Sequence, residues 1–534
     1  MWLTIADKNF CISRGTVSDV AMHTCRVRQM TPSGTAAQMR TWLGSFRRRQ
    51  LERSFSPVRY LGKSLRSLLS LFAVHAAAAA SVAPVRADAQ KKQIDYPALR
   101  DETVRAMSEY LQINTTSPPG NELATARWLK AFLAKEGIEG EILDTAELGP
   151  GRANFYARVK GDGTKKAIAL VHHMDVVPAN PELWSVPPFS GTVKDAYVWG
   201  RGALDMKSQG IIHLLSIVAL KRAGVHLSRD IVFIANADEE VEGSGATVFT
   251  RRHPDLLKDV EFLITEGEGT KVDHGVVRWF AVGVGEKRAY WLRLVAHGTT
   301  AHGSIPRADN PVPRIARAVE RVAAWQTPIR LLPAVDRFLK AQATLETGER
   351  RSWLANAAQA LETPNGRAYI LSDPYRNAIL RNTIAPTVLT GSKQTNIIPP
   401  VASAELDVRL LPDEDTVAFR RELARVIDDS SVHVEVMPGV MPSYNANIDT
   451  PLVRAVEEEI AVLLPGVLVT TPLAAGATDR PTYSHAGVQA YGLEPYIVED
   501  SEEVRGVHGV DERLSIANIE FGLRLITGVI QRMQ

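Results

Sequence analysis

One stretch limits the fold more than any other: residues 167–178 read AIALVHHMDVVP, an apolar run that ends in two histidines and an aspartate. Ala167–Val171 predicts a short buried strand, because aliphatic and β-branched residues follow one another without a polar break. Open α/β sheets carry their functional groups just beyond the carboxyl ends of such strands, which is where His172, His173 and Asp175 fall. Imidazole is the commonest metal ligand, and a carboxylate two residues on could orient it. By itself this pattern fits a capped loop as well as a metal site.

Two later apolar runs end in acidic residues in the same manner. Ile231–Ala235 (IVFIA) is followed by Asn236–Glu240 (NADEE), and Val260–Ile264 is followed closely by Glu266. A strongly apolar helix is expected over Met206–Ala223. Strands that alternate with helices predict an α/β fold, with a mostly parallel sheet flanked by helices on both faces. The three strand ends would then meet at one rim of the sheet.

The pattern changes at Arg288. From there to Val436 the expected elements follow the order β-α-β-β-α-β, which predicts an inserted two-layer lid domain. We therefore expect a basic N-terminal extension with a signal peptide at 1–89, a catalytic domain at 90–286 and 441–534, and the lid at 287–440. Residues 331–377 form an extra, partly helical segment within the lid that the pattern does not place.

Charge is unevenly distributed along the chain. Residues 1–89 hold 13 of the 62 Lys and Arg residues and 4 of the 60 Asp and Glu residues, which leaves 49 basic and 56 acidic residues and a formal charge of −7 for the remainder. That balance argues against nucleic acid as the main partner. The chain is 45% hydrophobic and 23% charged, as globular proteins are, and no apolar run is long enough for a stable membrane span.

Leu61–Ala89 resembles an export signal, with basic residues, then an apolar run, then Ala87-Asp88-Ala89 as a small-residue cleavage site. It predicts a periplasmic or secreted protein. The alternative is a disordered basic tail on a cytoplasmic protein. Both cysteines, Cys11 and Cys25, lie in this extension, so the rest of the chain needs no disulfide and fits either compartment.

Six acid or imidazole groups are expected at strand ends or in loops. They are His173, Asp205, Glu239, Glu240, Glu266 and His508. Two histidines with carboxylates suit Zn²⁺, which accepts both nitrogen and oxygen ligands. Adjacent glutamates are often only a solvated pair, but an acidic pair directly after a buried strand is unfavourable without a cation, because like charges repel there.

The motifs GRGALDMK, NADEE, LITEG, GTTAHGSIP and HGVDERLS, in this order around HHMDVVP, resemble those of the di-zinc aminoacylase and carboxypeptidase family. That family includes glutamate carboxypeptidase, aminoacylase-1 and succinyl-diaminopimelate desuccinylase. The resemblance runs from about residue 95 to the end of the chain. The extra lid segment and the HGVDER ending are most similar to the branch of Gly-X carboxypeptidase and N-fatty-acyl amino acid hydrolase.

The resemblance implies a ligand set for two zinc ions, for which Co²⁺ or Mn²⁺ could substitute. His173 and Glu266 would bind one ion, and Glu240 and His508 the other. Asp205 would bridge both, and relatives have a cis peptide after this aspartate, so we expect one at Asp205–Met206. A metal pair of this kind acidifies a bound water and polarises the scissile carbonyl.

The resemblance also implies roles for residues that are not ligands. Glu239 would be the general base, passing a proton from water to the leaving nitrogen. Asp175 would orient His173. His302, in the AHGSIP loop of the lid, would reach the substrate carbonyl, often from a neighbouring subunit; the alternative is a surface histidine.

Four further positions match substrate-binding positions of the family: Asn396, Arg409, Gly476 and Thr478. Arg409 could equally be an exposed strand cation. Two departures from the family pattern stand out. Where the family usually has glycine before the ligand histidine, this chain has His172, which would place a second imidazole beside the site. Where the family usually has a GGTD or GTTD loop, this chain has AGATDR, which puts the contacts of that loop in doubt.

We expect a zinc-dependent hydrolase that cleaves an amide bond next to a free carboxylate and releases an amino acid from short peptides or N-acyl amino acids. A homodimer through the lid domain is a further expectation. One alternative is a dipeptidase or deacylase dedicated to a single metabolite, and another is a catalytically dead binding protein on this scaffold. No G-x-S-x-G motif supports a serine nucleophile.

Overall fold

The computed structural model describes residues 93–268, 270–273, 275–439, 442–497 and 506–534, all within the compact unit Arg86–Gln534. The expected signal Leu61–Ala89 lies outside the described residues. Among the described helices, none combines the length and the apolar character needed to cross a bilayer.

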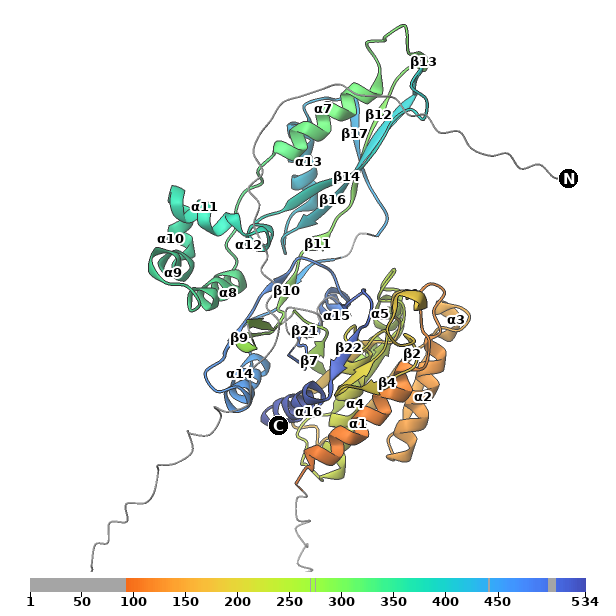
Figure 1. The fold of residues 1–534 in the computed structure, drawn as a ribbon, viewed down its shortest axis with the longest axis vertical. Helices are drawn as coiled ribbons and strands as arrows, with labels where there is room; N and C mark the ends of the chain where they lie inside the picture. Colours follow the sequence, from red (N-terminus) through yellow and green to blue (C-terminus); the bar gives the residue numbers. More distant parts are fainter. Residues whose placement is uncertain (1–92, 269, 274, 440–441, 498–505) are drawn as a thin grey trace, which may run out of the picture. The chain divides into compact units, whose positions relative to one another are not determined.

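A six-stranded sheet forms the core of the fold (Figure 1). Its order is β1 (Gly140–Leu143), β2 (Asn154–Val159), β6 (Ile231–Asn236), β3 (Ala167–His173), β7 (Val260–Thr265) and β21 (Gln489–Gly492). The last four are mutually parallel, whereas β1 and β2 join antiparallel. Every residue of β3 is buried, as its unbroken apolar sequence predicted. The predicted α/β fold with a mostly parallel sheet is confirmed.

Alternate residues of the central strands face two different hydrophobic clusters. Ile168 and Leu170 belong to one cluster, with α1 (Tyr96–Leu111), α2 (Glu122–Lys135), α4 (Lys207–Arg222), α14 (Pro451–Leu463) and α16 (Ile516–Arg532). Ala169 and Val171 belong to the other, with α5 (Ser244–Arg252), α6 (Pro254–Leu257) and α15 (Arg480–His485). Helices therefore cover both faces of the sheet.

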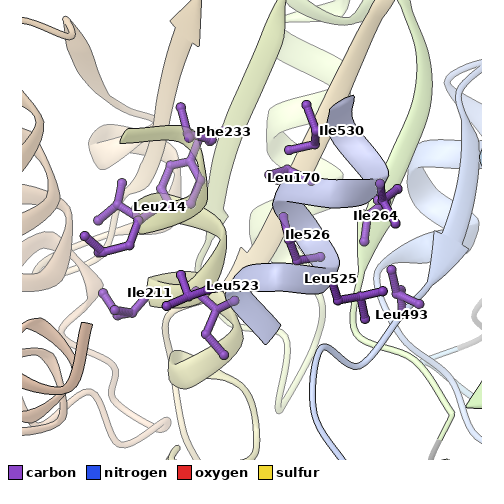
Figure 2. Close-up of a cluster of buried hydrophobic side chains, with 14 of the residues drawn as sticks. Leu170, Ile211, Leu214, Phe233, Ile264, Leu493, Leu523, Leu525, Ile526 and Ile530 are labelled. Atoms are coloured by element: carbon purple, nitrogen blue, oxygen red, sulfur yellow. The ribbon is translucent and has the colours of Figure 1, made fainter. Parts of the chain in front are cut away.

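Helix α16 fills the centre of the larger cluster (Figure 2). Its Leu523, Ile526 and Ile530 are fully buried among side chains of β3, β7 and α4. Each such side chain contributes about 1.5–3 kcal/mol on burial. The C-terminal helix thus holds the sheet and α4 in place, and with them the strand ends.

Short strands and turns surround this core. They are α3 (Thr145–Leu148), η1 (Pro181–Leu183), the sheet of β4 (Thr192–Lys194), β5 (Tyr197–Trp199) and β22 (Arg513–Ser515), and the sheet of β8 (Lys271–Asp273), β9 (Val276–Ala281) and β19 (Leu468–Thr470). A third sheet pairs β10 (Gly285–Glu286) with β18 (Tyr444–Asn445) and β20 (Leu473–Ala474). The chain therefore leaves the core and returns to it along adjacent strands.

Between β10 and β18 the chain forms a second, two-layer structure of sheet and helices. Its sheet contains β11 (Arg288–Ala289), β12 (Leu292–His297), β14 (Thr383–Thr390), β16 (Val401–Leu410) and β17 (Val432–Val436), all antiparallel. The helices α7 (Pro311–Ala324) and α13 (Thr416–Ile427) share one apolar cluster with it. A small ladder joins β13 (Ala301–His302) to β15 (Ile397–Ile398). The predicted β-α-β-β-α-β lid is confirmed.

The segment that the sequence did not place forms five short helices, here called the helical insert. They are α8 (Pro333–Ala343), α9 (Gly348–Ala355), α10 (Ala357–Leu361), α11 (Pro364–Ser372) and α12 (Pro374–Ile379). The insert has its own apolar cluster, which also contains Trp279 of β9 and Leu473 of β20. The helical insert therefore packs against β9 and β20.

Candidate metal centre

Five of the predicted groups come together in two sets of three that share Asp205. His173, Asp205 and Glu266 form one set, with His173 Nε2 3.0 Å from Asp205 Oδ1 and 3.7 Å from Glu266 Oε2. Asp205, Glu240 and His508 form the other, with His508 Nε2 3.1 Å from Asp205 Oδ2 and 3.0 Å from Glu240 Oε2. Each oxygen of Asp205 thus faces one imidazole, as a carboxylate between two cations would.

The fold explains why these groups meet. His173 is the last residue of β3, Glu240 follows β6, and Glu266 follows β7. These three strands are parallel neighbours, so their carboxyl ends deliver side chains to one rim. Asp205 lies two residues before the start of α4, and the Asp205–Met206 peptide is cis, as expected.

His172 does not lie beside the ligands, contrary to the expectation. Successive side chains of a strand point to opposite faces, so His172 turns away from His173. Its Nε2 is hydrogen-bonded to the Tyr110 hydroxyl at 3.0 Å, and its ring packs 5.3 Å from that of Phe233. The second imidazole is therefore part of the core on the α4 side, where a Cβ on Gly210 would lie only 2.3 Å from its Cδ2.

Asp175 does more than orient one histidine. Its Oδ1 lies 3.6 Å from His173 Nδ1, which donates instead to the backbone carbonyl of Asp175 at 3.1 Å. Its two carboxylate oxygens accept hydrogen bonds from the backbone N–H groups of Glu239 and Glu240, each at 3.1 Å. One buried carboxylate therefore fixes the loop that carries both glutamates.

Glu512 fixes the loop of the bridging aspartate in the same manner. Its Oε1 accepts from the N–H groups of Leu204 (2.6 Å) and Asp205 (3.0 Å). Its Oε2 accepts from the N–H of Gly202 (2.9 Å) and from Arg201 Nη1 (2.7 Å). Glu512 is fully buried and Arg201 nearly so. The role of Glu512 was not predicted from the sequence, where its place in the HGVDER motif, four residues after His508, was the available signal.

Metal-free, the centre holds protons on its imidazoles. Burial lowers the pKa of His173, but Asp175, Asp205 and Glu266 outweigh it and raise that pKa well above the usual value. Hydrogen bonds to Asp205 and Glu240 raise the pKa of His508 to about 10. Burial raises the pKa of Asp205, yet the two imidazoles hold it below its ordinary value. Two imidazoles facing a shared carboxylate and two flanking glutamates fit a pair of divalent cations.

Glu239 belongs to neither ligand set of the described residues. Burial, together with repulsion by Glu266, raises the pKa of Glu239 well above its usual value. A carboxyl group with this tendency to hold a proton, next to a metal pair, is suited to acid–base chemistry.

A cavity of about 900 Å³ opens onto the ligands. Its wall includes Asp205 and Glu266, together with Gly476 and Thr478 of the loop that the sequence assigned to the pocket. Directly after this loop, the buried Arg480 binds Glu268 at 2.7 Å and Glu286 at 2.5 Å. Sequence reasoning missed this charged group, as well as Glu494 on the same wall.

The three predicted lid residues, His302, Asn396 and Arg409, are not among the residues that line this cavity. His302 is exposed on β13, where its Nδ1 is hydrogen-bonded to Ser304 Oγ at 2.7 Å. Asn396 is next to it, since its carbonyl accepts from the N–H of Gly303 at 2.7 Å. Arg409 lies on β16 and binds Asp407 at 2.7 Å. The structure thus brings His302 and Asn396 together, and it places none of the three lid residues on the described wall of the cavity.

Comparison with known proteins agrees with this geometry. A family model described as peptidase family M20/M25/M40 matches residues 169–532, which is more than half of the chain. The chain belongs to this family. It is an M20 metallo-hydrolase, and its family contains carboxypeptidases, dipeptidases and N-acyl amino acid hydrolases.

Individual relatives agree with the family assignment. The M20 chain is 28% identical over 384 residues to N-fatty-acyl-amino acid synthase/hydrolase PM20D1 of Homo sapiens, covering 69% of this chain and 74% of that protein. The M20 metallo-carboxypeptidase Sso-CP2 of Sulfolobus solfataricus matches with a TM-score of 0.62 at 20% identity, over 81% of this chain and 99% of that one. YXEP of Bacillus subtilis, a dinuclear metal binding peptidase, matches with a TM-score of 0.52 at 16% identity, over 82% and 98%. The two solved structures share the fold.

Proposed function

We propose that this M20 chain hydrolyses an amide bond next to a free carboxylate and releases an amino acid from short peptides or N-acyl amino acids. We further propose that zinc is its metal. The observation that carries the proposal is the pair of three-residue sets sharing Asp205, placed at the rim of a cavity large enough for such a substrate. The names of the relatives, a metallo-carboxypeptidase and an N-fatty-acyl-amino acid hydrolase, support both parts of the substrate class.

The ligand roles follow from the contacts. His173 and Glu266 would hold one ion and Glu240 and His508 the other, with Asp205 between them. When bound, the ions supply an acidified water and polarise the scissile carbonyl. Imidazole and carboxylate donors suit Zn²⁺, with Co²⁺ or Mn²⁺ as substitutes.

Glu239 is the proposed proton carrier. Its carboxylate takes the proton from the attacking water and delivers it to the departing amide nitrogen, so the amine leaves neutral. Asp175 keeps Glu239 in place through the backbone N–H bond at 3.1 Å. The resulting products are a carboxylic acid and a free amino acid.

The lid would contribute the remaining substrate contacts. His302 would donate to the oxygen of the scissile carbonyl, and Asn396, its neighbour, would bind the substrate carboxylate. Arg409 would have to leave Asp407 to take part. Gly476 and Thr478 already line the cavity.

The test combines metal analysis with a substrate panel. Freshly purified protein should contain about two metal ions per chain and should cleave at least one member of a panel of dipeptides and N-acyl amino acids. Reactivation of chelated protein by Zn²⁺, compared with Co²⁺ and Mn²⁺, identifies the metal. Two bound ions without turnover of any member would favour a binding protein on this scaffold, and no metal uptake would refute the site. Cleavage of one member alone would indicate a dedicated dipeptidase or deacylase.

Two further proposals concern assembly and location. We propose that two copies pair through the lid, because β14 bonds only β16 among the described strands and exposes Val388 and Leu389. Mass measurement by light scattering, with Leu389→Lys as the disrupting variant, tests this pairing.

We also propose export to the periplasm or the medium, on the pattern of Leu61–Ala89. Fusion of that segment to a reporter that is active only after export tests the second proposal.

A further inference from the structure

Glu494 stands on the cavity wall at the end of β21. Register pairs Gly492 of β21 with Thr265 of β7, and the N–H of Leu493 donates to the carbonyl of Thr265 at 3.0 Å. Two residues later, the Tyr496 hydroxyl donates to the carbonyl of Leu204 at 2.6 Å. Residues on both sides of Glu494 are therefore hydrogen-bonded to the segments that carry Glu266 and Asp205, and all three acids line one cavity.

The carboxylate of Glu494 has no hydrogen-bond or ion-pair partner among the described residues, although it is partly buried. The arginine on this wall is engaged elsewhere, because Arg480 binds Glu268 and Glu286. Lys271 also lines the cavity and makes contacts of its own. Burial, with the charge of Glu268 close by, raises the pKa of Glu494 to about 8. A positively charged ligand would stabilise the ionised form of such a carboxyl group and form a charge-assisted hydrogen bond with it.

The rest of the wall suits such a ligand. Trp279, Phe338 and Tyr375 line it and pack edge to face, with ring centroids 5.7 and 5.8 Å apart. The oxygens Gln342 Oε1 and Thr270 Oγ1 are buried there without a hydrogen-bond partner. Aromatic rings combined with free acceptor oxygens are the surroundings in which proteins bind ammonium groups. A purely aliphatic chain would leave these acceptors and Glu494 unsatisfied.

The charge of this wall bears on which end of the substrate lies there. Glu268 is already paired with Arg480, so Glu494, which has no ion pair among the described residues, is the group whose ionised form disfavours the free carboxylate of the released amino acid. The acyl part of the substrate is the part that fits.

We propose that Glu494 is a specificity-determining residue that binds a protonated amine on the acyl part of the substrate. This inference rests on the proposed amide hydrolysis and narrows it. The chain prefers aminoacyl substrates, such as peptides with a free amino group, over N-acyl amino acids with plain hydrocarbon chains. Phe338, Gln342 and Tyr375 come from the helical insert, so the insert supplies part of this selectivity.

The experiment compares isosteric substrate pairs on the metal-loaded, full-length protein. One pair is ε-aminocaproyl-leucine and heptanoyl-leucine, which differ only in a terminal ammonium against a methyl group. The other is norleucyl-leucine and 2-methylhexanoyl-leucine, in which a methyl group replaces the ammonium next to the carbonyl. A hydrogen bond to a charged group is commonly worth a factor of roughly 10–100, so kcat/KM for one amine substrate should exceed that of its partner by this factor.

The decisive variant is Glu494→Gln, which keeps the shape and removes the charge. It should erase the preference by lowering kcat/KM for the amine substrate, with kcat/KM for the hydrocarbon partner unchanged or raised and metal content unchanged. Glu435→Gln, on the exposed end of β17, is the matched control and should change neither value. A wild-type preference for the hydrocarbon substrates, or an equal loss for both members of a pair in Glu494→Gln, would overturn the assignment.

Failure of the proposed function gives a different result. If no substrate of either pair is cleaved, titration calorimetry with the same four compounds replaces the rate assay. Tighter binding of the amine compound, lost in Glu494→Gln, then supports the assignment, and equal binding of both members refutes it.

Discussion

Replacement of the buried Glu512 by glutamine tests how the centre is held together. The carboxylate accepts four hydrogen bonds, from Arg201 and from three backbone N–H groups that include that of Asp205. A carboxamide has one acceptor oxygen, so its NH₂ group must face two of these donors whichever way it turns. The variant also leaves the guanidinium of Arg201 buried without its counter-charge.

The magnitude follows from those contacts. Breaking a buried ion pair by removing one partner destabilises a protein by about 3–5 kcal/mol. We therefore expect Glu512→Gln to lower the free energy of unfolding by roughly that amount. Because the lost bonds hold the backbone of Asp205, the affinity for both metal ions should fall as well. Arg201→Met should be destabilising too, but the double variant should be less destabilised than the two single effects combined, since it leaves no uncompensated charge.

The assay is denaturant unfolding of chelated protein, followed by metal titration of each variant. Chelation removes the contribution that bound metal makes to stability. Glu435→Gln serves as the exposed control. A change of less than about 0.5 kcal/mol in Glu512→Gln, with unaltered metal affinity, would refute the argument that this carboxylate positions the bridging aspartate.

Three further predictions concern the chemistry. Glu239→Gln should keep about two metal ions by elemental analysis while activity falls about 10²–10⁴-fold, because it removes the base and no ligand; retained activity would contradict the role. His302→Ala should keep its metal and lose roughly 10²–10³-fold in kcat if this side chain donates to the oxyanion, whereas unchanged turnover would make it a surface histidine. In the metal-free protein His508 holds its proton up to a pKa of about 10. A cation must displace that proton, so chelator competition should show affinity rising up to about tenfold per pH unit between about pH 6 and 8; a flat profile would contradict this.

The grouping of the candidate ligand residues was predictable because each follows a recognisable strand or lies in a recognisable motif. An apolar run such as Ala167–Val171 fixes both the strand and the rim at which the next polar residue falls. The two-layer lid was predictable for a similar reason, since its strands alternate and its helices are long. The order of the sequence motifs, through the family resemblance, then implied which residue bridges the ions and which is the base, roles that residue spacing alone left open.

Other features depend on tertiary contacts that no local pattern reveals. The helices of the insert are short, and the insert shares its core with Trp279 and Leu473, which are distant in sequence. Glu512 reads as one more charged residue until four donors surround it. The adjacency of His172 and His173 suggested a shared site, whereas the alternation of side chains along β3 places them on opposite faces.

The packing of His172 against Gly210 has a consequence for how related sequences can vary. A Cβ on Gly210 would lie 2.3 Å from the imidazole, so the large side chain of His172 on β3 requires glycine at this position of α4. A glycine in place of His172 would remove this contact and leave room for a Cβ at position 210. The two positions should therefore exchange bulk during divergence, and Gly210→Ala should be tolerated here only together with a small residue in place of His172.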